Sequence, residues 1–333
     1  MYKVGIVGVG FIGKKHAQII KDHKEFELKG VCDLSLSKLS DYNCFKTTNL
    51  DELLEQPLDI LVVSTPNHLH AEHSIKALKK GCHVICEKPL SLKSHDALMM
   101  METAHLVGKN LFCMLQNRFS PIVQWLKKVI REKQLGKIYW VQVNCLWNRD
   151  ERYYQNSDWK GKLNKDGGVL FTQFSHFTDI LIYLFGHLIT IHHTQFWNFN
   201  HPYIEFEDSG SLNFQLNSEI HVNFQYSIST FEKNLESSIT ILGEKGTIKI
   251  GGQYMNELIA CHIKDYEIPK IEEIPVNQYP GYQGSASTHL QVYNEVIEVL
   301  KGKPPQISSI QDAFYSVQLI EKIYQRRVLN FCK

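Results

Sequence analysis

Hydrophobic positions in the first third of the chain alternate between two kinds of pattern. Strands are predicted at residues 2–7, 26–32, 59–64, 82–86 and 111–115, and the run at 59–64 is continuously apolar. Apolar positions at helical spacing occur between them, at residues 12–20, 67–80 and 94–107. A continuous apolar run is typical of a strand that is covered on both faces. Strands that alternate with helices predict right-handed crossovers and a parallel, doubly wound sheet.

The pattern changes after about residue 118. A long alternating strand is predicted at residues 137–147 and a helix at residues 169–185. Several strand-like runs with turn signals follow between residues 187 and 264, and two more helices are predicted at residues 289–300 and 311–326. Neighbouring strands joined by short turns favour antiparallel pairing. We therefore predict an α/β domain over residues 1–118 and an α+β domain with an open, mainly antiparallel sheet over residues 119–333.

Charge and composition exclude several classes of protein. The 333 residues contain 36 Lys and Arg against 35 Asp and Glu, a formal charge of +1 with no basic block, so no nucleic-acid partner is expected. No apolar run approaches the ~20 residues of a membrane span, and the start MYKVGIVGVG lacks the features of a signal peptide. We expect neither a membrane partner nor secretion, and a cytoplasmic location.

The eight cysteines show no framework spacing, which favours reduced thiols. They are Cys32, Cys44, Cys82, Cys86, Cys113, Cys145, Cys261 and Cys332. Cys82, His83 and Cys86 lie on one predicted strand, where neighbouring side chains face opposite ways. We expect no metal site.

A glycine-rich turn follows the first strand. Gly8, Gly10 and Gly13 fit the spacing G-x-G-x-x-G between a predicted strand and a predicted helix. In that context the glycines allow a tight turn, close approach of a pyrophosphate and close helix–strand packing. Asp33 ends the second strand, where a carboxylate binds both ribose hydroxyls of NAD and repels a 2′-phosphate. Two alternatives remain: a plain surface Asp33, and a phosphate contact from Lys38.

Two further loops fall at the carboxyl ends of predicted strands, the edge at which such sheets bind ligands. The first contains Ser64, Thr65, Pro66, Asn67 and His70, and the second contains Glu87, Lys88 and Pro89. Lys88 is suited to hydrogen-bond a substrate hydroxyl and to stabilise developing negative charge. Equally, it fits a surface lysine paired with Glu87.

Several motifs resemble a known family over essentially the whole chain. The stretches STPNHLHAEHSIKALKKGCHVICEKPL and DGGVLFTQFSHFTDIL are similar to the glucose-fructose oxidoreductase/inositol dehydrogenase (Gfo/Idh/MocA) family. The resemblance implies an N-terminal Rossmann domain that binds NAD, and a C-terminal sheet that often forms an oligomer interface, hence a homo-oligomer, dimer or tetramer. It also implies oxidation of a sugar or inositol hydroxyl, with Lys88 and His176 as catalytic residues. Many members have Asp four residues before the His, where this chain has Thr172, followed by Gln173.

One branch of the family fits better than the rest. The run from Trp147 through Arg149, Tyr153 and Tyr154 to Asp158-Trp159-Lys160-Gly161 and Asp166-Gly167-Gly168 resembles UDP-N-acetylglucosaminuronate 3-dehydrogenases of lipopolysaccharide synthesis. This resemblance implies oxidation of a nucleotide-sugar at carbon 3, with a downstream aminotransferase as a further partner. Lys160 stands where the branch has Arg, which keeps the charge and loses the bidentate geometry. Dehydrogenation of a free sugar or inositol, an NAD-dependent glycosidase and a non-catalytic NAD sensor are the alternatives.

Together these arguments give a set of candidate site residues. His176 is the candidate base because imidazole titrates near working pH; Asp179, predicted on the same helix, either orients its ring or forms a salt bridge elsewhere. The candidate substrate residues are Lys88, Arg118, Arg149, Tyr153, Tyr154, Thr172, Gln173 and His176. The candidate cofactor residues are Gly8, Gly10, Phe11, Ile12, Gly13, Asp33, Ser64, Thr65, Pro66, Asn67, His70, Glu87, Lys88, Asn117, Trp159 and Lys160. A solvated loop or a subunit contact is the alternative for the stretch around Arg149.

Overall fold

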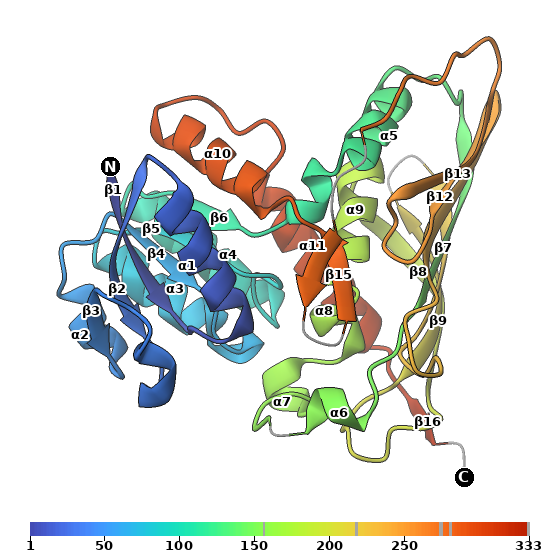
Figure 1. The fold of residues 1–333 in the computed structure, drawn as a ribbon. Coiled ribbons are helices and arrows are strands. Elements are labelled where there is room, and N and C mark those ends of the chain that lie inside the picture. The colour runs from blue at the N-terminus through green and yellow to red at the C-terminus, as the bar shows by residue number, and fades with distance from the viewer. Residues whose placement is uncertain (156, 217–218, 273–275, 280–281, 332–333) are drawn as a thin grey trace. The chain divides into compact units, whose positions relative to one another are not determined.

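In a computed structural model the chain forms two compact units (Figure 1). The first comprises Met1–Leu115 with Val292–Val317, and the second comprises Gln116–Gln291 with Gln318–Lys333. The structure describes residues 1–155, 157–216, 219–272, 276–279 and 282–331, so Cys332 lies outside the described residues. The predicted division lies after residue 118, whereas the first unit ends at Leu115, and a late segment returns to the first unit.

The first unit is built on a parallel sheet. Its six strands are β1 (Tyr2–Val7), β2 (Phe26–Cys32), β3 (Phe45–Thr47), β4 (Ile60–Val63), β5 (His83–Cys86) and β6 (Leu111–Cys113). They lie in the order β3-β2-β1-β4-β5-β6, and every pair is parallel. All four residues of β4 are buried, as expected for a central strand covered on both faces. This order is that of a Rossmann domain, which confirms the predicted fold class.

Helices connect these strands. They are α1 (Phe11–Asp22), α2 (Leu50–Leu54), α3 (His70–Lys79) and α4 (Ser94–Leu106), with short 3-10 turns at Leu36–Leu39 and Asn67–Leu69. The helix predicted to begin at Asn67 begins at His70, because Asn67 opens the 3-10 turn and does not cap the helix. This turn and the start of α3 belong to one of the candidate loops.

The returning segment carries α10 (His289–Leu300) and the first part of α11 (Ile310–Tyr324). Tyr293 of α10 is fully buried, and its hydroxyl lies 2.8 Å from Nδ1 of His16 on α1. Its ring packs edge-on against Phe26 at 5.4 Å between centroids, and Lys301 pairs with Glu25 at 2.7 Å. These contacts with α1 and β2 are the physical reason that residues 292–317 belong to the first unit.

The second unit is built on an eight-stranded sheet (Figure 1). Its strands are β7 (Ile138–Leu146), β8 (Leu188–Asn198), β9 (Ser209–Leu216), β10 (Ile220–Ser227), β11 (Glu236–Gly243), β12 (Gly246–Gly251), β13 (Glu257–Ile263) and β16 (Leu329–Phe331), and β14 (Val276–Tyr279) pairs separately with β15 (Tyr282–Ala286). The order is β13-β12-β11-β7-β10-β9-β8-β16, with parallel pairs only at β7–β10 and β8–β16 among the described strands. The prediction of an open, mainly antiparallel sheet is confirmed.

Helices cover one face of this sheet. They are α5 (Pro121–Arg131), α6 (Glu151–Tyr154), α7 (Leu163–Asp166), α8 (Val169–Thr172) and α9 (Ser175–Phe185), with a 3-10 turn at Gln116–Phe119. Phe174 and Phe177 lie against Tyr226 of β10 and Trp147 after β7. Elsewhere on the strands of this sheet Ile189, Leu242 and Ile259 are exposed.

The predicted helix at residues 169–185 is interrupted. Phe174 has φ −109° and ψ 9°, outside the helical range, and the segments Leu163–Thr172 and Ser175–Phe185 meet at an angle of 52°. The prediction of one continuous helix was therefore wrong, and Gln173 does not lie on the helix of His176. Within the described part of the chain no single helix is both long and apolar enough to cross a membrane, and this bent pair passes that test by length and composition only.

Candidate active site

The glycine turn between β1 and α1 leaves no space for side chains at two of its three positions. Gly8 has φ +86°, and a Cβ there would lie 2.5 Å from the Ser64 carbonyl oxygen. A Cβ at Gly13 would overlap the carbonyl oxygen of Gly8. A Cβ at Gly10 would meet no atom within 4 Å, and Gly10 is the N-cap of α1, which has no side-chain cap. An open approach to uncapped helix N–H groups suits a pyrophosphate, so these residues fit a dinucleotide.

Asp33 connects the end of β2 to this turn. Its Oδ2 accepts a hydrogen bond from the Val9 amide at 3.0 Å, and its Oδ1 accepts one from the Ser35 amide at 2.9 Å. Lys38 pairs with the same carboxylate at 3.3 Å. A carboxylate offers about four lone-pair positions, so acceptor sites remain for ribose hydroxyls. Asp33 is therefore held by two main-chain amides, which argues against a plain surface residue.

The loop after β4 is tied to the glycine turn and to the Glu-Lys-Pro motif. The Ser64 hydroxyl donates to the Gly8 carbonyl oxygen at 2.7 Å. His70 is buried, with Nδ1 2.6 Å from the Pro89 carbonyl oxygen and Nε2 2.9 Å from that of Thr65. The ring of His70 thus joins two loops, and its predicted cofactor contact stays a prediction. Burial lowers the pKa of this imidazole.

Glu87 and Lys88 follow β5. The buried Glu87 carboxylate accepts from Nε2 of His16 at 2.9 Å through Oε1 and from the Lys88 amide at 3.1 Å through Oε2. Lys88 itself is half-buried, and the bond to Pro89 is cis. Burial lowers the pKa of Lys15, one residue before His16, to about 8, although the Glu87 charge opposes this shift. No motif in the sequence points to His16 or Lys15.

His176 lies in the first turn of α9 and is buried. Its Nε2 is 3.2 Å from the side-chain nitrogen of Gln116. An amide nitrogen donates, so Nε2 is the acceptor in this contact. Gln116 is a neighbour of His176 that no motif in the sequence indicated. The side-chain oxygen of the next residue, Asn117, is buried and has no hydrogen-bond partner among the described residues.

Arg118 forms a buried ion pair with Asp179. Its Nε is 2.8 Å from Oδ2, and a second guanidinium nitrogen is 2.6 Å from Oδ1. The two side chains are 0% and 2% exposed, and the guanidinium also lies 4.8 Å from the centroid of the Tyr183 ring. Asp179 thus forms the salt bridge that was the alternative to orienting His176, and the predicted substrate contact of Arg118 stays a prediction.

Three predicted substrate residues form one polar cluster. Nε of Arg149 donates to Oε1 of Gln173 at 2.7 Å, and Nε2 of Gln173 lies 2.8 Å from the Tyr153 hydroxyl. The guanidinium also donates to Oδ1 of Asn234 at 3.1 Å and lies over the Trp147 ring at 4.8 Å. Asn234 carries no sequence signal, since it comes from the connection between β10 and β11.

Residues around this cluster have other tasks. Tyr154 is buried edge-on against Tyr153 and His201, and its predicted sugar contact stays a prediction. Nζ of Lys160 lies 3.9 Å from the centroid of the Tyr153 ring, and burial lowers its pKa, with the Asp166 charge opposing. Lys160 and the half-buried Trp159 stay predictions as cofactor ligands.

Thr172 stands where many members of the family have Asp, and its side chain is hydrogen-bonded within the protein. Its hydroxyl donates to the carboxylate of Asp166, whose other oxygen accepts from the Gly161 amide at 2.9 Å. Burial raises the pKa of Asp166 to about 6, against the effect of these hydrogen bonds. Thr172 thus anchors the turn that leads through Gly167 and Gly168 into α8.

Neither a metal site nor a disulfide is found in the described part of the chain. No three His, Cys, Asp or Glu side chains are grouped there to hold a metal ion. The seven described cysteines form no disulfide.

Comparison with known proteins gives two family matches and several similar structures. The family described as "Oxidoreductase family, NAD-binding Rossmann fold" (GFO_IDH_MocA) matches residues 2–114, and its "C-terminal alpha/beta domain" matches residues 127–327. The WlbA dehydrogenase from Bordetella pertussis, solved with NADH and UDP-GlcNAcA, is 30% identical with a TM-score of 0.87, covering 97% of this chain and 95% of that one.

Two further relatives are informative. The WlbA enzyme from Chromobacterium violaceum, also solved with NADH and UDP-GlcNAcA, is 29% identical with a TM-score of 0.84, covering 97% of this chain and 93% of that one. Glucose-6-phosphate 3-dehydrogenase of Bacillus subtilis is 27% identical over 98% of this chain and 96% of its own. The two family matches together cover most of the chain; the protein therefore belongs to the Gfo/Idh/MocA family of oxidoreductases, and NAD is its cofactor.

Proposed function

We propose that this protein oxidises the carbon-3 hydroxyl of a nucleotide-sugar uronate such as UDP-N-acetylglucosaminuronate. One observation carries the proposal: Arg149, Tyr153 and Gln173 form a single hydrogen-bonded cluster in a chain similar over its whole length to two dehydrogenases solved with UDP-GlcNAcA. A guanidinium held at a fixed place suits recognition of a carboxylate or a phosphate.

The residues divide the work as follows. NAD, when bound, would supply the acceptor for the hydride. The glycine turn and Asp33 hold the dinucleotide, as their geometry fits. His176 accepts the hydroxyl proton; its Nε2 lies 3.2 Å from the side-chain nitrogen of Gln116. Lys88 keeps the role that the sequence predicts, a hydrogen bond to a substrate hydroxyl that stabilises developing negative charge. Arg149 binds the acidic group of the substrate.

The wider setting is part of the same proposal. The product, a 3-keto sugar nucleotide, suits an aminotransferase that installs an amine for surface-polysaccharide or lipopolysaccharide synthesis. We place the reaction in the cytoplasm, where thiols stay reduced, and we propose that the chain works as a homo-oligomer.

A second candidate reaction is carbon-3 oxidation of a free sugar phosphate. The whole-length similarity to glucose-6-phosphate 3-dehydrogenase supports it. Both candidate substrates carry an anionic group, so the same arginine serves either.

The test is a single reaction followed by mass spectrometry. The protein is mixed with NAD, 2-oxoglutarate and either UDP-N-acetylglucosaminuronate or glucose 6-phosphate, and the sugar is followed. Loss of two hydrogens from the nucleotide-sugar supports the proposal, and loss from glucose 6-phosphate supports the second candidate. A His176→Ala variant is expected to bind NAD normally and to turn over neither compound. An unchanged mass for both, with NAD bound, would overturn both assignments.

A further inference from the structure

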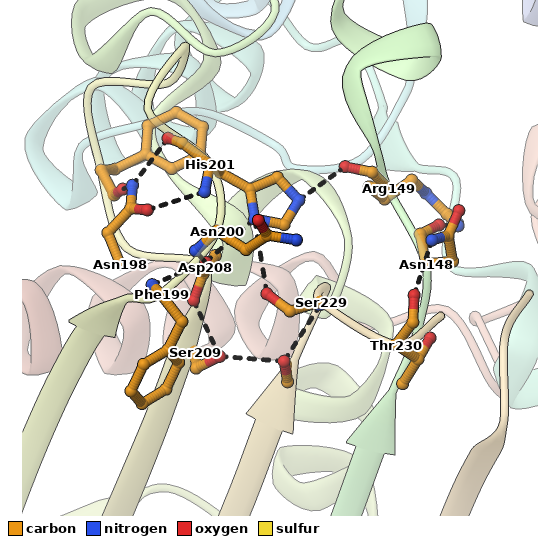
Figure 2. A network of polar contacts seen from close by, with 12 residues as sticks. Asn148, Arg149, Asn198, Phe199, Asn200, His201, Asp208, Ser209, Ser229 and Thr230 are labelled. Carbon is orange, nitrogen blue, oxygen red and sulfur yellow. Dashed lines mark hydrogen bonds and ion pairs between the residues drawn. The ribbon is translucent and has the colours of Figure 1, made fainter. Parts of the chain in front are cut away.

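The second unit contains a buried histidine that contacts the main chain of Arg149. His201 belongs to the connection between β8 and β9 and is 2% exposed. Its Nδ1 is 2.9 Å from Oδ2 of Asp208, and its Nε2 is 3.0 Å from the main-chain oxygen of Arg149. Figure 2 shows the ring between these two partners. No motif in the sequence points to this histidine.

Asp208 is arranged as an ionised acceptor. Burial disfavours its charge, but hydrogen bonds from His201, the Asn200 amide and the Ser209 hydroxyl together lower its pKa. The amides of Phe199 and Asn200 both donate to Oδ2 at 2.8 Å. A carboxylate and a carbonyl oxygen only accept hydrogen bonds. The hydrogen bond between Nε2 of His201 and the Arg149 carbonyl oxygen therefore has the ring as its donor.

The main chain of His201 is held equally firmly. The side chain of Asn198 accepts from the His201 amide and donates to its carbonyl oxygen, each at 2.9 Å. The ring also contacts Tyr154 and Tyr203, at 6.4 and 5.4 Å between centroids. The imidazole is thus a fixed donor.

This donor fixes the backbone at Arg149. The Arg149 amide donates to the Ile228 carbonyl oxygen at 3.0 Å, and its own carbonyl oxygen accepts from His201. With both main-chain groups held, the side chain extends to Gln173 and Asn234. A line of contacts consequently runs from Asp208 through His201 to the main chain of Arg149, whose guanidinium is held by Gln173 and Asn234.

We propose that His201 and Asp208 are positioning residues that set the place of the Arg149 guanidinium, and so determine selectivity for an acidic sugar nucleotide. This inference rests on the proposed function for its substrate, while the positioning itself is a property of the protein alone.

Two isosteric variants separate positioning from folding. In the His201→Gln variant, the amide nitrogen of the glutamine reaches the position of Nε2 and keeps the hydrogen bond to the Arg149 carbonyl oxygen. The nitrogen of His201→Asn reaches only the place of Nδ1 and keeps the bond to Asp208. With UDP-N-acetylglucosaminuronate, His201→Asn is expected to raise KM about tenfold, equal to about 1.4 kcal/mol, with kcat within about twofold. In His201→Gln, KM is expected to stay within about threefold of the wild type. His193 is exposed, so His193→Ala serves as the control.

A second measurement needs no substrate. The Nε–H of Arg149 donates to Gln173, so it gives a protected signal in a nitrogen–proton NMR spectrum, assigned by its loss in Arg149→Lys. The signal is expected to persist in His201→Gln and to shift or vanish in His201→Asn. If both variants keep the wild-type signal and KM, or if both lose them equally, the positioning role is overturned. If the wild type does not oxidise the nucleotide-sugar, the proposed function fails, while the NMR comparison still decides the role of His201.

Discussion

Arg118 and Asp179 show how burial changes what a charged residue does. Each has the chemistry of a ligand or a relay group, yet the two are fully withdrawn from solvent and bonded to each other. Removing one partner of such a pair leaves an uncompensated buried charge, whereas replacing both with apolar residues is often tolerated.

Asp179→Ala is therefore expected to lower the free energy of unfolding by about 3–5 kcal/mol. The double replacement Arg118→Met with Asp179→Leu is expected to recover most of that loss, because it leaves no orphaned charge. Denaturant unfolding of the three proteins makes the comparison. A double variant as unstable as Asp179→Ala would contradict the argument.

Asp166 provides a prediction about pH. Burial raises its pKa in the folded protein to about 6, above the ordinary value of 3.8. The folded state therefore binds more protons than the unfolded chain between these values. The contribution of Asp166 to stability is complete below about pH 4 and is lost as the pH rises through about 6.

The asparagine in Asp166→Asn cannot titrate. The free energy of unfolding of this variant is therefore expected to rise relative to that of the wild type as the pH is raised. The difference between their free energies of unfolding should move in its favour by up to about 3 kcal/mol from pH 4 to pH 7. Paired denaturant titrations at several pH values measure this. A difference that is flat with pH would mean that Asp166 has an ordinary pKa.

At the scale of elements, the alternation of strands and helices was predictable because the spacing of apolar residues within each segment indicates its type. The same holds for the glycine turn, whose spacing fixes backbone geometry. The break between α8 and α9 was not predictable, since apolar residues continue through residues 169–185. What accompanies the break is distant in sequence: Gln173 bonds Arg149 and Tyr153, which lie 24 and 20 residues upstream. The ion pair of Arg118, the packing of Tyr154 and the contact of Asn234 with Arg149 were not predictable for the same reason, because burial and partners are set by the tertiary fold.

The first turn of α1 permits a test that separates two roles of glycine. Gly13→Ala places a methyl group against the Gly8 carbonyl oxygen, where there is no space for it, so it is expected to destabilise the protein by about 1–3 kcal/mol. Gly10→Ala meets no atom within 4 Å, and we expect its stability to stay within about 1 kcal/mol of the wild type.

NAD affinity is expected to fall at least about tenfold in Gly10→Ala, because the methyl group enters the space through which the pyrophosphate approaches. Calorimetric binding and thermal unfolding of both variants measure the two effects. Wild-type affinity in Gly10→Ala would show that the dinucleotide does not approach the helix there.

For the whole molecule, the chain order and the compact units do not coincide. Residues 292–317 complete the first unit although the second unit lies between them and the rest of it in sequence. The sequence did not indicate this return, because α10 is an amphipathic helix whose pattern does not name its partner. The contacts of Tyr293 with His16 and Phe26, and the Lys301–Glu25 ion pair, do so.

Tyr293→Ala should accordingly weaken the N-terminal half of the chain. Loss of a large buried aromatic side chain costs about 3–5 kcal/mol. Amide hydrogen exchange is expected to quicken in β1 and β2, while β7 and β9–β11 exchange as in the wild type. Equal acceleration in both sheets would contradict the assignment of α10 to the first unit.

The late return of α10 also bears on how the protein is made. A ribosome adds roughly 5–20 residues per second, so roughly ten to forty seconds separate synthesis of β6 from synthesis of Tyr293. During that interval His16 and Phe26 lack the partner that covers them in the finished protein. The dinucleotide-binding unit is thus the first to be started and among the last to be completed, and a nascent chain halted before residue 292 would expose an unfinished surface to chaperones.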